Sequence, residues 1–106
     1  MTYDSLSHIF AALADPTRRA IFDDLRQADR SVTELAKSFP VSRPAVSQHL
    51  KVLEQANLVV ATPKGSHRIY SVHRDGLTAL RTYLDGVWDE ALAAYAAEIT
   101  ARNKKR

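Results

Sequence analysis

The stretch from Val41 to Val59 (VSRPAVSQHLKVLEQANLV) has the residue types that could form hydrogen bonds with a charged partner. At helical spacing its residues divide into a polar set (Arg43, Pro44, Ser47, Gln48, Lys51) and an opposite apolar set (Val46, Leu50, Leu53). The apolar set would anchor the helix, and the polar set would face water or a partner. Short polar and bidentate side chains near a helix N-terminus suit the base edges of the DNA major groove, and a lysine one turn further on suits a phosphate.

Positive charge is concentrated in the same region. The 106 residues have a formal net charge of +3, and residues 41–74 alone contribute +4 because five basic side chains there accompany the single acid Glu54. Residues 1–40 sum to −1 and residues 75–106 to 0. A local excess of this kind is what a polyanion-binding face requires.

The flanking residues predict the helices that hold this stretch. Apolar residues at helical spacing indicate a first helix ending at Asp15-Pro16, a second running to about Asp29, a third from Ser31 to Pro40, and a fourth from Ser42 to about Ala56. Ser31 and Glu34 match a capping box, and Asp15 and Ser42 are the expected caps of the second and fourth helices.

A β-hairpin and a long helix are expected after Asn57. The segments 58–62 and 68–72 are β-branched or aromatic and are separated by the turn residues 63–66. Lys64, His67 and Arg68 surround Gly65, whose missing side chain lets a tip turn tightly and approach a phosphate chain. A basic tip that is merely solvated is the alternative. Leucines and other apolar residues at three- and four-residue spacing then predict a helix from about 74 to 101.

This order predicts a winged helix-turn-helix, mostly α with a small β-hairpin, as one domain over residues 1–106. The helix-turn-helix would span about 31–56 and the wing about 58–73. The candidate DNA-binding residues are Ser42, Arg43, Pro44, Ser47, Gln48, His49, Lys51, Lys64, His67 and Arg68. Of these, His49 lies between the two helix faces, where packing against a neighbouring helix is slightly favoured over DNA contact.

Several classes of function are disfavoured. The chain has no cysteine, so thiolate metal sites, iron–sulfur clusters and Cys nucleophiles are excluded. It also has no Gly-rich phosphate loop, nucleophile elbow or zinc-protease His pair, which argues against an enzyme and predicts no cofactor. No apolar run approaches the roughly 20 residues needed to cross a bilayer, and the N-terminus lacks a signal-peptide layout, so a cytoplasmic protein is expected.

Three stretches resemble the ArsR-type winged-helix repressors of bacteria: ALADPTRRAIFDDL at 12–25, SVTELAKSFPVSRPAVSQHLKVLEQANLV at 31–59, and GSHRIYSV at 65–72. They occur in the family's order and spacing. The resemblance implies a homodimeric repressor that binds double-stranded DNA at a palindromic operator. It also implies that the first and last helices pack across a two-fold axis. The expected dimer interface is formed by Leu6, Ile9, Phe10, Leu80, Leu84, Val87, Trp88 and Tyr95.

The sequence departs from the metal-sensing members of that family. Such members use cysteines before the recognition helix, or His and acidic ligands on the last helix. Here the last helix has Asp85, Asp89, Glu90 and Glu98 but no His. Carboxylates alone suit a transition-metal sensor poorly, so the resemblance is closer to the metal-independent branch, which includes autorepressors.

Three alternatives stay open from the sequence. The apolar stripe of the last helix could simply close the core of its own chain. The basic face could bind an acidic protein partner, or a metal effector could be held by His and carboxylates. The effector, if there is one, is not identified.

Overall fold

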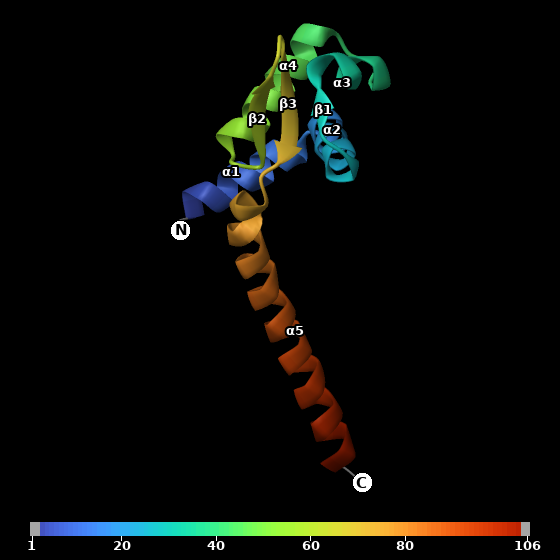
Figure 1. Ribbon diagram of the computed structural model, residues 1–106. Coiled ribbons are helices and arrows are strands. Elements are labelled where there is room, and N and C mark those ends of the chain that lie inside the picture. Colours follow the sequence, from blue (N-terminus) through green and yellow to red (C-terminus); the bar gives the residue numbers. More distant parts are fainter. Residues whose placement is uncertain (1–2, 105–106) are drawn as a thin grey trace.

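Over residues 3–104, which a computed structural model describes, the chain forms five α-helices, a three-stranded antiparallel sheet and one short 3₁₀ turn (Figure 1). The elements are α1 (Tyr3–Ala14), α2 (Pro16–Gln27), β1 (Arg30–Ser31), α3 (Val32–Ser38), α4 (Arg43–Gln55), β2 (Val59–Lys64), β3 (His67–Val72), η1 (Arg74–Leu77) and α5 (Thr78–Lys104). The prediction of a mostly helical chain with a small hairpin is confirmed.

The sheet contains a strand that the sequence did not reveal. β2 and β3 form the expected hairpin, with Val59 opposite Val72 and Lys64 opposite His67. β1 pairs with the other edge of β3, so that the strand order is β1-β3-β2. A strand of two residues is too short to leave an alternating pattern, and it forms because the chain between α2 and α3 runs along β3.

Side-chain caps start three of the helices at the expected residues. The Asp15 carboxylate accepts a hydrogen bond from the backbone N–H of Arg18 (2.8 Å), and the Ser42 hydroxyl accepts one from that of Ala45 (3.2 Å). Ser31 and Glu34 form a complete capping box at α3. These bonds satisfy backbone donors that have no partner within the helix, and they fix where α2, α3 and α4 begin.

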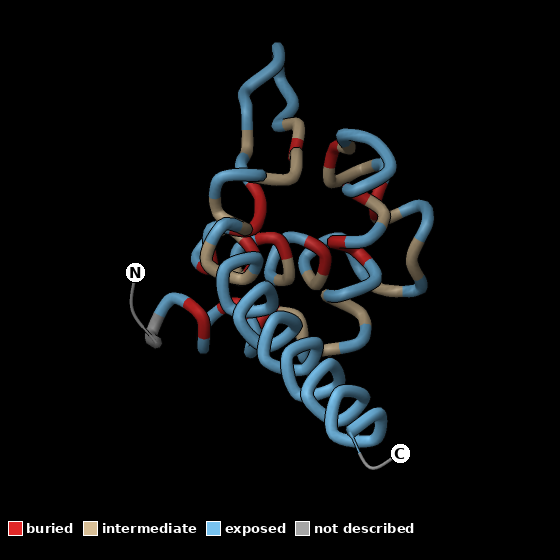
Figure 2. Tube along the Cα trace, turned by 90° about the horizontal axis from the view of Figure 1, so that it is seen from below, coloured by how far each residue is buried: buried red, intermediate tan, exposed pale blue. Residues whose placement is uncertain are grey.

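The core lies where α1 to α4 meet one another and the sheet (Figure 2). Its fully buried members are Ile21, Leu35, Val46, Leu50, Leu53 and Leu58, all at 0% exposure. Three of these belong to α4, so that helix is held on one side by its own apolar residues. Figure 2 shows the buried segments gathered in the body of the molecule and none along α5.

The last helix leaves the body of the molecule instead of covering it. Its first turns pack on the core through Ala79 and Leu80, and the remainder extends outward as a rod in a molecule 70 Å long (Figure 1). Trp88 and Tyr95 are 65% and 62% exposed. The alternative that the apolar stripe closes the core of its own chain is therefore wrong beyond Leu80. The bounds also differ from 74–101, because residues 74–77 form η1 and α5 continues to Lys104.

Two residues expected at a dimer interface are instead core residues of the single chain. Leu6 and Ile9 are only 7% and 2% exposed, and Ile9 packs within the main apolar cluster. The same face of α1 that was assigned to a partner is covered by the chain itself, and little of either side chain is left for another copy. Phe10, on the outer side of α1, is 45% exposed and makes an edge-on contact with Tyr83.

The end of α4 is joined to η1, the short turn before α5, by a tight backbone contact. Asn57 adopts a left-handed conformation (φ 61°), and the N–H of Leu58 donates to the carbonyl of Leu53 (3.0 Å), as in a Schellman motif. A methyl group placed at Gly76 would lie 1.6 Å from the carbonyl oxygen of Asn57. Only glycine fits at this crossing, which sets the direction in which α5 leaves the body.

We expect Gly76→Ala to lower the free energy of unfolding by about 2–4 kcal/mol, because neither backbone can move aside without breaking the motif. Urea denaturation followed by circular dichroism measures the change. Gly86→Ala is the matched control, since a methyl group there meets nothing within 4 Å and should stabilise α5 slightly. Equal effects of the two substitutions would contradict the role assigned to Gly76.

Candidate nucleic-acid interface

The polar face of α4 is exposed because its opposite face is buried. Val46, Leu50 and Leu53 are fully buried, whereas Ser47 and Lys51 are exposed to solvent. Pro44 sits in the first turn, where no intrahelical hydrogen bond is lost. The amphipathic pattern of α4 therefore orients the helix and leaves its polar side chains exposed.

One groove brings the start of α4 together with the wing, which is the hairpin β2–β3. Arg43 and Ser47 line it from α4, and His67 and Arg68 line it from β3. These are four of the ten residues predicted to bind DNA, and they come from segments about twenty residues apart. Two cationic groups and a hydroxyl on one concave surface suit a phosphate backbone and the base edges beside it.

A second groove continues along α4. Ser47 and Lys51 line it together with Arg68, so both grooves share Ser47 and Arg68. Glu54 also lines it and is the only acid between residues 41 and 74. Its carboxylate repels phosphate, which limits the basic surface toward the C-terminal end of α4.

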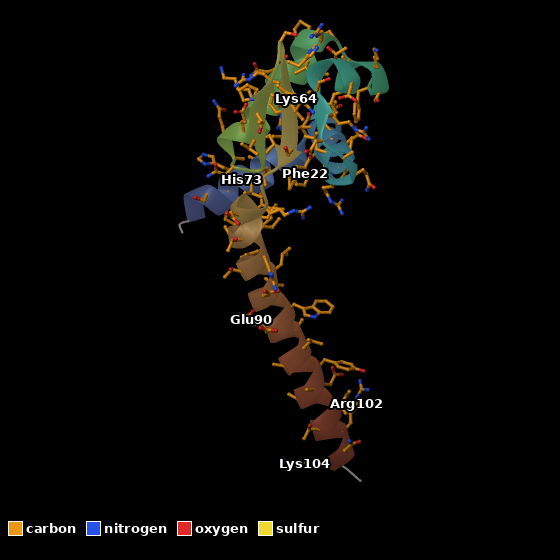
Figure 3. All side chains as sticks on the ribbon, viewed as in Figure 1. Phe22, Lys64, His73, Glu90, Arg102 and Lys104 are labelled. Atoms are coloured by element: carbon orange, nitrogen blue, oxygen red, sulfur yellow. The ribbon has the colours of Figure 1, made fainter. Side chains whose placement is uncertain are left out.

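Five predicted residues line neither of these two grooves: Ser42, Pro44, Gln48, His49 and Lys64. Gln48 and Pro44 are exposed on α4, and Lys64 is exposed at the end of β2 beside the wing tip (Figure 3). Gly65 makes that tip with a positive φ of 63° and has open space around its Cα. Ser42 is exposed, and its hydroxyl already accepts the capping hydrogen bond.

His49 points away from these residues. Its Nδ1 lies 3.4 Å from a guanidinium nitrogen of Arg18 and 4.0 Å from a carboxylate oxygen of Asp15, and its side chain is only 20% exposed. This is the packed arrangement that the sequence slightly favoured. The pKa of Asp15 is held below its usual value mainly by the hydrogen bond from the backbone N–H of Arg18.

The groove contains residues that sequence reasoning missed. Thr33 on α3 and Ser66 at the wing tip line it with the predicted set. The position of Thr33 on α3 was predictable, because the Ser31 cap places Thr33 in the first turn of that helix. What could not be read from the sequence is that β1 holds this turn against β3.

The capping box fixes the start of α3, which lines the groove. The backbone N–H of Ser31 donates to Glu34 Oε1 (2.9 Å), and the N–H of Glu34 donates to the Ser31 hydroxyl (3.2 Å). The bond from the Ser31 N–H is the main reason that the pKa of Glu34 lies below its usual value.

Residues 3–104 contain neither a metal-binding cluster nor a membrane-spanning helix. In that range no group of three or more His, Cys, Asp or Glu side chains could hold a metal ion. Among the helices described there, none has the length and apolar character needed to cross a membrane.

Known proteins are similar to this chain in both sequence and fold. Residues 13–61 match the family described as "Helix-turn-helix domain". The chain is 54% identical over 95 residues to the HTH-type transcriptional regulator Rv2034 of Mycobacterium tuberculosis, covering 90% of this chain and 89% of that protein. It is 37% identical to the transcriptional repressor SdpR of Bacillus subtilis, over 64% of this chain and 76% of that protein.

Two solved structures have the same fold. An ArsR-like transcriptional regulator from Rhodococcus sp. RHA1 is 36% identical and superposes with a TM-score of 0.75, over 88% of this chain and 91% of that one. A homodimeric winged helix-turn-helix DNA-binding domain from Mycobacterium bovis is 27% identical, with a TM-score of 0.68 over 83% and 82% of the two chains. The chain therefore belongs to the ArsR family of winged helix-turn-helix transcriptional regulators, and the predicted winged fold is confirmed.

We expect Glu34→Gln to lower stability at neutral pH, with a difference from wild type that disappears on acidification. The folded-state pKa of Glu34 is depressed, so its contribution is present above the unfolded value near 4.5 and is lost as the pH falls through the folded value. Urea midpoints measured between pH 7 and pH 3 test this. Glu90→Gln on the exposed part of α5 is the control, and a Glu34 difference that persisted at low pH would refute the electrostatic origin.

Proposed function

We propose that this chain is a sequence-specific DNA-binding repressor that acts as a homodimer on a palindromic operator in a bacterial promoter. The observation that carries the proposal is the continuous surface on which Arg43 and Ser47 of α4 adjoin His67 and Arg68 of the wing. Its family membership supports the same function, since the relatives include a protein named as a transcriptional repressor.

The two parts of this surface have different tasks. Arg43, Ser47 and Gln48 lie in the first two turns of α4, whose N-terminal residues reach base edges when such a helix enters the major groove. Lys51, Lys64 and Arg68 carry the positive charge that neutralises phosphates on either side. Thr33 and Ser66 contribute hydroxyls to the rim of the same groove. Base contacts then select the sequence, and phosphate contacts set the register.

The exposed face of α5 supports the homodimer. Its apolar side chains Leu84, Val87, Trp88, Leu92, Tyr95 and Ile99 are between 37% and 65% exposed, and Phe10 of α1 is exposed as well. An apolar surface of this extent marks an interface, and a two-fold partner can cover it with the same surface. The neighbour from Mycobacterium bovis is itself homodimeric. Two α4 helices about 34 Å apart would then read half-sites one helical turn apart.

Repression follows from occupancy, because a dimer bound across a promoter excludes other proteins from that DNA. We place the chain in the metal-independent branch of the family, since it has no cysteine and the last helix has no histidine. We expect the protein to act in the cytoplasm. The promoter of its own gene is the first DNA target to test. The protein-interaction alternative has no specific observation in its favour.

We expect Lys64→Ala to weaken binding to every duplex and to lower its salt dependence, whereas Arg43→Ala and Gln48→Ala weaken binding and relax sequence choice. Each lost phosphate contact should reduce the slope of log affinity against log salt by about 1. Fluorescence anisotropy with its own upstream DNA and with a scrambled duplex measures both effects.

Lys104→Ala is the charge-matched control, because Lys64 and Lys104 lie at opposite ends of the molecule (Figure 3). It should bind as the wild type does. Binding that is insensitive to salt and to Arg43→Ala, or a nuclease-resistant protein complex without duplex binding, would rule out the proposed function.

We expect Trp88→Glu to convert the dimer to a monomer, because it places a charge in the centre of the exposed apolar face of α5. Sedimentation equilibrium over a range of concentrations measures the association. Ala93→Glu adds the same charge on the opposite side of α5 and should leave the dimer intact. A wild type that stays monomeric at micromolar concentration would refute the dimer.

A further inference from the structure

A polar cluster outside the proposed DNA surface joins three helices at one point. The Arg18 guanidinium lies where α1 ends, α2 begins and α4 passes. Its Nε donates to the carbonyl of Ala12 (2.6 Å), and one terminal nitrogen donates to that of Ala11 (3.3 Å). The other terminal nitrogen lies 3.4 Å from Nδ1 of His49 on α4.

The contacts with α1 use groups that otherwise lack partners. The last carbonyls of a helix have no intrahelical donor, and a cation near them is also favoured by the helix dipole. Arg19 does the same for the carbonyl of Leu13 (2.8 Å). An arginine near the start of α2 is therefore sufficient to cap α1, and the contact with His49 is not needed for that role. Of the two arginines, only Arg18 also contacts His49.

The contact with His49 orients the ring. Arginine has only donors, so in this contact the guanidinium donates and Nδ1 of His49 accepts. His49 is next to Gln48 in the sequence, and with one-fifth of its side chain exposed it has little room to rotate. This ring therefore holds the middle of α4 against the start of α2, one residue away from the base-reading Gln48.

We propose that Arg18 is a positioning residue for DNA recognition, which ties α1 to the recognition helix α4 through His49. The inference rests on the proposed function. α1 carries Phe10 toward the proposed dimer interface, and α4 carries the base-reading side chains. A rigid polar link between them holds both recognition helices of a dimer at the angle that one duplex requires. Arg18 and His49 themselves touch no DNA.

The test compares full-length wild type with Arg18→Gln, His49→Leu and the double variant. The probes are a duplex selected by the wild type from a random library and a scrambled duplex of equal length. We expect each single variant to bind the selected duplex roughly tenfold more weakly, the worth of one hydrogen bond to a charged group. Binding to the scrambled duplex and the salt slope should stay unchanged. The double variant should be no worse than either single one.

Two further variants separate positioning from general stability. His49→Asn keeps an acceptor close to the position of Nδ1 and should retain the wild-type preference. Arg19→Gln removes a cap of α1 without touching α4 and should also retain it. Circular dichroism and sedimentation check that every variant is folded and dimeric. If Arg18→Gln fails to fold, the comparison of His49→Leu with His49→Asn tests the proposal instead.

Additive losses in the double variant would overturn the proposal. Equal loss on both duplexes with a shallower salt slope would also overturn it, because His49 or Arg18 would then contact phosphate directly. If the wild type selects no duplex, the proposed function fails instead. In that case the same four proteins still show, by the additivity of their melting temperatures, whether Arg18 and His49 are coupled.

Discussion

The burial of one side of α4 is the constraint on which the rest of the structure depends. Val46, Leu50 and Leu53 have no exposure, and removing any of them from the core would cost about 2–5 kcal/mol in a chain this small. That burial decides which residues of α4 face outward. The polar face is therefore a consequence of packing, and its chemistry can vary without loss of the fold. This separation lets one scaffold present different side chains to a partner.

Burial fixes which face of α4 points outward, and polar contacts then hold the helix against sliding and tilting. The Ser42 cap fixes where α4 begins, and in the middle of the helix the contacts of His49 with Arg18 and Asp15 tie α4 to α2. At the C-terminus, Asn57 in the left-handed conformation stops the helix, and its carbonyl abuts Gly76. Because Gly76 lies in η1, two residues before α5 begins, the same contact also sets the direction of α5.

Local chemistry made most of the fold predictable. Caps at Asp15, Ser31 and Ser42, prolines at the starts of helices and the turn around Gly65 are all short-range signals, and each lies where the sequence placed it. The parts that were missed depend on contacts between distant segments. β1 is too short to show a pattern, and the burial of Leu6 and Ile9 depends on which neighbour covers the apolar face of α1. An amphipathic pattern predicts that a face is buried, and it does not identify the partner.

The length of α5 explains why a second copy is needed. A helix of 27 residues is about 40 Å long, and only its first turns touch the body. A helix without tertiary contacts is marginal in water, since most helical stability in proteins comes from packing an apolar face. The apolar residues from Leu84 to Ile99 supply such a face, and the described chain does not cover it. Association would then stabilise α5 and bring two basic surfaces onto one duplex, so that folding of this helix and DNA binding become thermodynamically linked.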